Sequence, residues 1–427
     1  MKISDKSIKL FNFFSKYHIV SISPLKKNAK HVIDELYVNI MESFEYIHRL
    51  QLTLYCKIKY KEIKSSSEIR YPKNFSLNDF PKEIIEQINN SVNYEICYTF
   101  NMFSRNINVY FLLEDQLNIE YNTYNEYIEL IISWLYILDK YGSSSCAKTL
   151  NIYIYHTSLE KKLPSSNIDI ISSNHVNTAF TTTCPINSEI VIFRKEEWFK
   201  VLIHETFHNF GLDFSGMNNK KCNETMLNIF DVESEVNLYE AYTETWACII
   251  NAMYACLLYI DNMSNKIDFY KHFQIFMQLE RTFSFFQMVK ALKFMGLSYE
   301  NLYNNEEQDK ILRNTLFKEN TNVLSYYIIK TILINNYNDF ILWCSKNNNQ
   351  FINFRKSLIN IDNFCNYIKK HYKSKSMLKN VNQVSLFFDD QHKLYHNSNH
   401  KNKYNKTSNN HHKFLLLNLR MSVCEIE

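Results

Sequence analysis

The chain reads Val-Leu-Ile-His-Glu-Thr-Phe-His from residue 201 to residue 208, and this stretch decides the fold. His204 and His208 are four residues apart, so on an α-helix they share one face and both rings can reach one metal ion about 2 Å from each nitrogen. Glu205 is offset from that pair and can reach a water molecule beside the metal. Zinc lowers the pKa of a bound water from about 15.7 to about 7, and a neighbouring carboxylate can then take its proton. The spacing predicts zinc-dependent amide hydrolysis with Glu205 as general base.

The flanking residues predict that this helix is largely buried. Arg194 to Glu197 would place acids in its first turn, where the helix dipole favours them, and Gly211 can end it in a left-handed turn. Because buried histidine and glutamate side chains need partners, the setting favours a metal site over a polar surface patch. Apolar residues recur at helical spacing through the stretch: Trp198, Phe199, Leu202, Ile203, Phe207 and Phe210.

A third protein ligand is expected, because catalytic zinc usually takes three side chains. Glu240 and Glu244 lie one turn apart on an otherwise apolar helix that begins near Asn237. With this helix the chain resembles the gluzincin metallopeptidases, in which H-E-x-x-H is followed by a helix carrying a glutamate ligand. The resemblance implies that Glu240 is the third zinc ligand and that Glu244 is a carboxylate that orients a zinc-bound histidine. The reverse assignment stays open, since residues 244–247 also fit a glutamate-x-x-alanine ligand motif.

The longer metzincin signature is an alternative, because residues 204–211 match its beginning. Its third ligand would stand three residues after the glycine, where this chain has Phe214, and Asp213 is one position short. No methionine-turn signal follows. A metzincin-like peptidase is therefore the minor alternative.

Upstream of the motif, the sequence predicts a small sheet and a helix. Residues 94–100 and 107–113 are expected to form a hairpin, residues 124–141 an apolar helix that ends at Gly142, and residues 150–155 and 189–193 further strands. By the resemblance, these are the sheet, backing helix and active-site helix of a zincin upper lobe. A short strand of Asn177, Thr178, Ala179 and Phe180 would then be the edge that pairs with an extended peptide substrate, or else an ordinary hairpin edge.

Downstream of residue 260 the pattern is helical and predicts a lower lobe over the cleft. Tyr326 and Tyr327 stand at a helix start there and are candidates to stabilise an oxyanion, although aromatic residues are common enough here to be core. We therefore expect an α+β protein with a zincin-like catalytic lobe followed by a helical lower lobe. The expected parts are an accessory N-terminal segment (1–88), a catalytic domain with both metal-bearing helices (89–260), a helical subdomain (261–373) and a low-complexity, disordered tail (374–427).

Composition narrows the classes of function. The 427 residues are 46% hydrophobic with only 4 glycines and 5 prolines, which favours a helix-rich α+β protein. The net charge of +4 is spread out and predicts no nucleic-acid partner. Abundant Asn, Ile, Lys, Tyr and Phe are typical of AT-rich genomes, such as those of large DNA viruses and some protists.

The sequence also bears on location. The first six residues carry charge too early for a secretory signal, and no run of about 18 apolar residues predicts a membrane span. The 10 cysteines form no C-x-x-C pair and are predicted to be buried, reduced thiols of an intracellular protein, in the cytoplasm of a cell or host or in a virion.

Two hypotheses result. The first is a zinc metallopeptidase that acts on a peptide or protein substrate. The second is a non-catalytic, virion-associated scaffold protein that keeps the zincin fold and its zinc. The sequence does not distinguish cleavage within a chain from trimming of an end.

Overall fold

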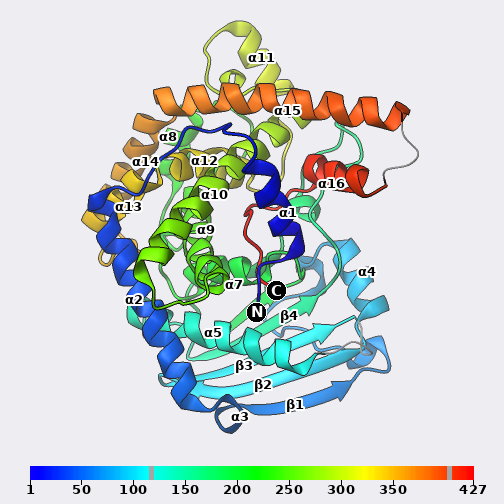
Figure 1. Cartoon of the computed structure of the whole chain (residues 1–427), viewed down its shortest axis with the longest axis vertical. Coiled ribbons are helices and arrows are strands. Elements are labelled where there is room, and N and C mark those ends of the chain that lie inside the picture. The colour runs from blue at the N-terminus through cyan, green and yellow to red at the C-terminus, as the bar shows by residue number, and fades with distance from the viewer. Residues whose placement is uncertain (115–119, 402–405) are drawn as a thin grey trace.

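The computed structural model describes residues 1–114, 120–401 and 406–427, and the side chains in these ranges apart from Thr53 and residues 396–411. Its lower half is a mixed sheet whose six described strands stand in the order β1-β2-β3-β4-β6-β5 (Figure 1). β3, β4 and β6 run parallel, whereas β1, β2 and β5 are antiparallel to their neighbours. The strands are β1 (Lys57–Glu62), β2 (Tyr94–Met102), β3 (Arg105–Leu113), β4 (Thr149–His156), β5 (Ala179–Thr181) and β6 (Asn187–Ile192).

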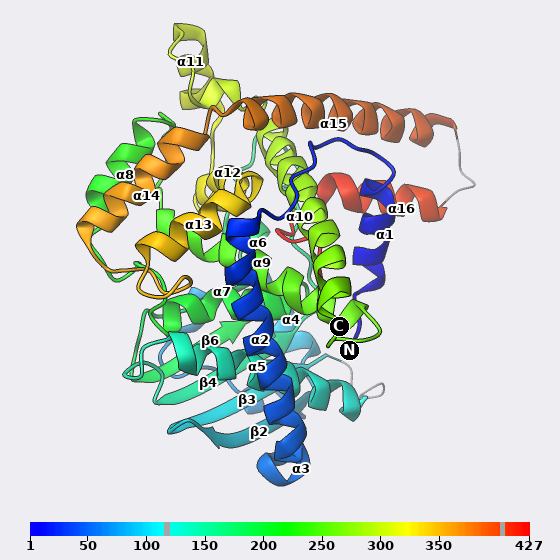
Figure 2. The same cartoon turned by 60° about the vertical axis from the view of Figure 1, so that its left-hand side comes forward.

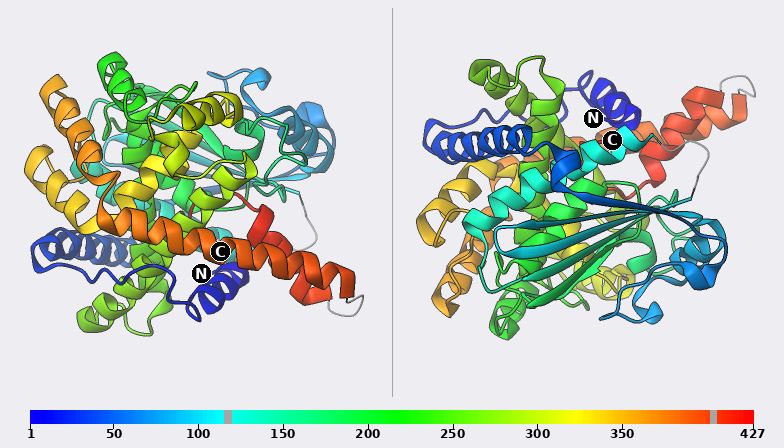
Figure 3. Two further views of the ribbon diagram at one scale, coloured as in Figure 1. Left: turned by 90° about the horizontal axis from the view of Figure 1, so that it is seen from above. Right: turned by 90° about the horizontal axis from the view of Figure 1, so that it is seen from below.

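Both faces of this sheet are covered, and the strand sequences show why. In β4, Ile152 and Ile154 join the main core, while Tyr153 and Tyr155 pack on the opposite face in a second cluster, as the two-residue period of a strand requires. The main core lies under α5 (Tyr121–Tyr141), α2 (Lys27–Leu50) and α7 (Trp198–Asn209) (Figure 2). The second cluster lies under α4 (Lys82–Ser91) and residues 63–80, and the view from below shows these segments beside the strands (Figure 3).

The helices stack above the sheet around α9 (Leu238–Tyr259), which is buried along most of its length, and α10 (Lys266–Phe294). One continuous apolar cluster joins these helices to the sheet. The other described helices are α1 (Asp5–Phe14), α3 (Leu52–Tyr55), α6 (Ser173–Val176), α8 (Lys220–Leu227), α11 (Glu307–Leu316), α12 (Lys330–Asn335), α13 (Tyr337–Asn347), α14 (Leu358–His371), the π-helical η4 (Leu324–Ile329) and the short 3-10 helices η1 (Ser66–Glu68), η2 (Leu77–Asp79) and η3 (Glu300–Leu302).

The predicted hairpin, apolar helix, strands and motif helix are all present, so the α+β class with a mixed sheet is confirmed. Within the N-terminal segment, β1 extends the sheet and α2 packs on α5. The division into domains at residues 88, 260 and 373 stays a prediction.

The prediction of a disordered tail at residues 374–427 was wrong for the part of this range that the structure describes. Residues 402–405 lie outside the described part. Two helices, α15 (Lys375–Lys401) and α16 (Lys406–Leu417), are followed by a buried segment, residues 418–426 (Figure 1). This segment pairs with the N-terminus through the Ile3–Ile426 bridge and lies against α7, α9 and α10. Such long-range partners stabilise a segment whose local composition alone predicts disorder.

The cysteine prediction also needs a correction. Cys146 and Cys184 form a disulfide across 38 residues, with Cα atoms 4.8 Å apart, whereas the eight other cysteines are free and buried. A spacing of 38 residues carries no signal for such a pair. Across the described ranges, no helix combines the length and the apolarity that crossing a bilayer demands.

Candidate metal centre

The crossing of α7 and α9 brings His204, His208 and Glu240 together. The Nε2 atoms of the two histidines are 3.2 Å apart, and a carboxylate oxygen of Glu240 lies 3.0 Å from Nε2 of His204 and 3.5 Å from Nε2 of His208. All three side chains are at least largely buried, and their nearest ligand atoms lie within 4.8 Å of one another. This group could hold a metal ion.

α7 is fixed at its centre and at its end. Within the helix, the Trp134 indole of α5 donates to Thr206 Oγ1 at 2.7 Å. Beyond the last turn, Gly211 has a φ of +66°, the left-handed conformation that favours glycine, as predicted. Its N–H donates to His208 O at 3.0 Å, so the turn closes directly behind the second histidine.

A carboxylate holds the far ring nitrogen of each histidine. Glu244 accepts from Nδ1 of His204 at 2.9 Å, and Asp213 accepts from Nδ1 of His208. Because each Nδ1–H is occupied, each Nε2 faces Glu240 as an acceptor for a metal. The structure thus places Glu240 among the metal-facing atoms and Glu244 behind His204.

Burial and mutual pairing shift the pKa values of this group. Burial alone would lower the pKa of His204, but the hydrogen bonds that its ring donates to Glu240 and Glu244 outweigh burial and raise that pKa. Burial alone would raise the pKa of Glu240, but the two histidines hold it well below its usual range. Glu240 therefore stays ionised and can act as an anionic ligand.

Glu205 follows His204 on α7, and both residues line one cavity. Burial raises the pKa of its carboxyl group, and the charges of His204 and His208 partly offset this effect. Its side chain lines a cavity of about 30 Å³, together with Thr178 and Ala179 at the sheet edge. A cavity of this size has room for one or two water molecules.

The two predicted tyrosines lie in different places. Tyr326 lines the same cavity and donates to Glu240 at 2.9 Å, whereas Tyr327 points into the core and donates to Leu419 O at 2.5 Å. The assignment of Tyr327 to the site was therefore wrong, because neighbouring positions of a helix face different directions. Tyr326 belongs to the π-helical turn η4, a local irregularity that is frequent at functional sites.

The predicted edge strand is at the sheet edge but begins later, at Ala179, so Asn177 and Thr178 precede it; three of the four predicted residues line the cavity. These are Asn177, Thr178 and Ala179. Phe180 instead packs against Phe80 on the other face of the sheet, with ring centroids 4.9 Å apart, because alternate strand residues point to opposite faces. Phe180 is thus not a site residue by its side chain.

The predicted start of the motif helix was wrong by several residues. α7 begins at Trp198, and the preceding acids bind other segments instead of occupying its first turn. Glu196 accepts from the side chain of Asn418 at 2.7 Å, and Glu197 accepts from the backbone of Ser422 at 2.6 Å. The buried C-terminal segment therefore takes up both carboxylates.

Sequence reasoning missed three residues beside the metal group. Lys200 donates to Glu244 at 2.8 Å, and Lys161 pairs with Glu197; both lysines are buried and line the cavity. Asp213 was considered only as a metal ligand. Its position five residues after His208, behind a glycine turn, was the available signal for its contact with that ring.

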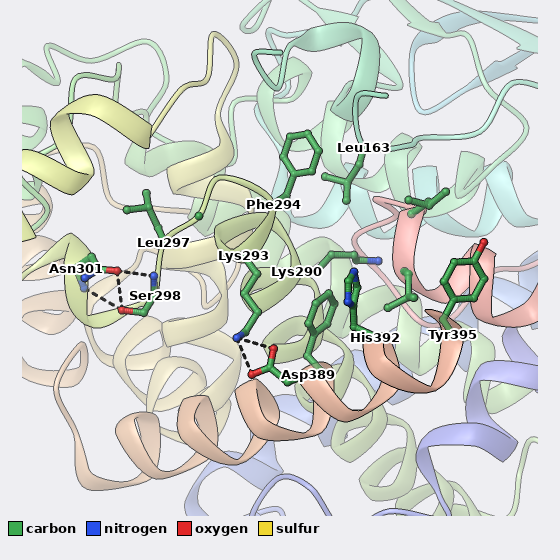
Figure 4. Close-up of a pocket in the computed structure, with 14 residues that line it drawn as sticks. Leu163, Lys290, Lys293, Phe294, Leu297, Ser298, Asn301, Asp389, His392 and Tyr395 are labelled. Atoms are coloured by element: carbon green, nitrogen blue, oxygen red, sulfur yellow. Dashed lines mark hydrogen bonds and ion pairs between the residues drawn. The ribbon is translucent and has the colours of Figure 1, made fainter. Parts of the chain in front are cut away.

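A larger cavity, of about 760 Å³, lies away from these residues between α10, α15 and α16 (Figure 4). Its walls are mostly apolar. Lys293 pairs with Asp389 there, and Lys290 donates to the carbonyl oxygens of Leu415 and Asn418 at the end of α16. The metal-binding group shares no residue with this cavity.

Comparison with known proteins identifies one distant relative. An uncharacterized protein of Acanthamoeba polyphaga mimivirus is 28% identical over 188 residues, which cover 40% of this chain and 47% of that protein. The chain thus matches about half the length of this relative, which comes from a large DNA virus, in line with the composition. No family model matches, and no solved structure matches.

Proposed function

We propose that this protein is a zinc-dependent peptidase of gluzincin type, with His204, His208 and Glu240 as ligands and Glu205 as general base. The observation that carries the proposal is the arrangement of the three ligand atoms. A tetrahedral zinc ion with bonds of about 2.0–2.2 Å separates its ligand atoms by about 3.3–3.6 Å. The three separations here are 3.2, 3.0 and 3.5 Å, so the residues fit the ion with little movement.

The chemistry divides between the ion and the chain. Zinc, when bound there, acidifies a water molecule and polarises the substrate carbonyl. Glu205 lies beside a cavity with room for that water, and it takes the proton as the water attacks. The same carboxyl group then passes the proton to the leaving amine as the amide C–N bond breaks.

Tyr326 supports the negative charge that develops on the carbonyl oxygen. Burial, together with the charges of Glu240 and Glu205, raises the pKa of its phenol well above the usual value, so the hydroxyl stays protonated and can donate. In this structure its single O–H donates to the ligand Glu240 at 2.9 Å, and it must turn from that oxygen to reach the carbonyl oxygen. A donor in this position stabilises an oxyanion in the transition state.

The geometry favours this arrangement over the metzincin alternative. Asp213 contacts Nδ1 of His208, on the opposite side of the ring from the Nε2 atom that faces Glu240. An aspartate on the Nδ1 side orients the histidine ring and is not itself a ligand of a metal bound at Nε2. Glu240 is therefore the better third ligand.

The test compares the wild-type protein with Glu205→Gln on a mixed peptide library, with zinc measured in both. We expect both proteins to carry zinc and only the wild type to cleave, with a loss of about 10²-fold or more in the variant. Equal action of the two proteins on the library would refute the role of Glu205. A wild type that binds zinc but cleaves nothing would instead support the non-catalytic scaffold.

A further inference from the structure

We infer that the site removes residues from the carboxyl end of a peptide, with Lys161, Lys200 and Thr178 binding the terminal carboxylate. This inference rests on the proposed peptidase function and adds its substrate class. Four features of the cleft carry it: the direction of the edge strand, a closed end, unused hydrogen-bond donors at that end, and the short distance from these donors to the metal group.

The edge strand sets the direction of a bound peptide. Thr178 O accepts a hydrogen bond from Phe193 N at 2.9 Å. Because hydrogen-bonded and non-hydrogen-bonded residues alternate along an antiparallel strand, the N–H and C=O of the next residue, Ala179, point away from β6 toward the outer edge of the sheet. Ala179 also lines the cavity beside Glu205. A peptide that adds to this edge in the commoner antiparallel sense runs opposite to β5, so its carboxyl end lies beside Asn177 and Thr178.

That end of the cleft is closed by the chain itself. The segment 317–323, which leads to Tyr326, crosses to the start of the edge strand. Thr321 Oγ1 donates to the side-chain oxygen of Asn177 at 2.9 Å, and Asn320 N donates to Ile171 O at 3.1 Å. A peptide that continued beyond Thr178 would meet these contacts, so a peptide bound along the edge strand would end there.

The closed end carries hydrogen-bond donors that are only partly used. An ammonium group has three N–H donors, and among the described residues Lys200 Nζ has one hydrogen-bond partner, Glu244, while Lys161 Nζ has one ion-pair partner, Glu197. The Thr178 hydroxyl is buried and has no hydrogen-bond partner in the same set of residues. All three residues line the cavity, and together they match a carboxylate, which accepts up to four hydrogen bonds.

The spacing along α7 limits how much is removed. Lys200 is four residues before His204, which is about 6 Å along a helix. An extended peptide covers about 3.3 Å per residue, so a carboxylate at Lys200 lies one or two residues beyond the carbonyl at the metal group. The reaction is hydrolysis: water adds to that carbonyl, the C–N bond breaks, and the released amino acid or dipeptide takes the proton on its amine.

The test uses the zinc-loaded full chain and pairs of peptides of one sequence, one with a free carboxyl terminus and one with a C-terminal amide. Products are identified by mass spectrometry. We expect loss of one or two C-terminal residues from the free acid and at least tenfold slower cleavage of the amide. Thr178→Val should raise KM for the free acid at least fivefold and so reduce the preference for the acid over the amide. Thr182→Val, at an exposed position of the same segment, is the matched control and should behave as the wild type.

The outcomes separate the two proposals. Equal cleavage of acid and amide, or cuts within a peptide blocked at both ends, would overturn the carboxyl-end inference and leave the peptidase standing. Cleavage of no peptide by the zinc-loaded protein would overturn the peptidase and this inference with it. If Thr178→Val leaves the preference for the acid intact, the assigned carboxylate site is wrong.

Discussion

Replacement of Glu244 by alanine should damage stability far more than replacement of Glu240. Glu244 has two buried partners, Nδ1 of His204 at 2.9 Å and Nζ of Lys200 at 2.8 Å. The Lys200 side chain is only 2% exposed, so Glu244→Ala leaves a buried ammonium without its counter-charge. Glu240 instead contacts Tyr326 and two histidines, and without the carboxylate these rings can lose their extra proton and become neutral near pH 7.

The expected magnitude follows from this difference. Removal of one partner of a buried ion pair costs about 3–5 kcal/mol. We therefore expect the free energy of unfolding of metal-free Glu244→Ala to fall by about that amount. Glu240→Ala loses only hydrogen bonds and should lose about 1–2 kcal/mol.

The assay is urea unfolding followed by tryptophan fluorescence in the presence of a chelator. The double variant Glu244→Ala/Lys200→Met is the matched control, because it removes the stranded charge together with its partner. It should be more stable than Glu244→Ala alone. A loss below about 1 kcal/mol in Glu244→Ala, or a double variant no more stable than the single one, would refute the reasoning.

Three further predictions concern other positions. Asp213→Ala should weaken zinc binding by about 10–100-fold, as judged by competition with a chromophoric chelator, because the far nitrogen of its histidine loses its acceptor; unchanged affinity would contradict this. Tyr326→Phe, assayed at saturating zinc because it also loses the hydrogen bond to the ligand Glu240, should lower kcat by about 10²–10³-fold, and an unaltered kcat would exclude it as an oxyanion donor. Burial lowers the pKa of His156 to about 3, whereas the unfolded value is about 6.5, so only the unfolded chain binds a proton between these values. The free energy of unfolding should therefore fall by about 2–3 kcal/mol between pH 6.5 and 4.5 because of His156, and this part of the pH dependence should be absent in His156→Leu. Parallel pH profiles of urea unfolding for the two proteins would refute this.

Local pattern predicts those elements whose partners are near in sequence. The strands β2 and β3 alternate and are joined by a short turn, and α5 ends at a glycine, so their positions are readable without the fold. The two histidines are set by helix geometry alone. Glu240 needed a resemblance as well, since nothing in the spacing of 32 residues from His208 says which face of α9 meets α7.

Local sequence patterns do not predict contacts between segments that are far apart in the chain. Residues 418–426 are ordered by the carboxylates of Glu196 and Glu197, more than 200 positions earlier in the chain. The same contacts explain why α7 starts later than its acids predict. Thr178 and Lys161 lie 17 positions apart outside the strands and line one cavity only in the folded chain, which no periodicity records.

The most direct test of the account is the zinc content of the purified protein. We predict one zinc ion per chain in the wild type and in Glu205→Gln, and less than a tenth of that in a variant with alanine at His204, His208 and Glu240, measured by mass spectrometry of the metal after dialysis. The circular dichroism of the triple variant controls for folding. A folded triple variant that keeps one zinc ion per chain, or a wild type that binds none when zinc is supplied, would contradict the central claim.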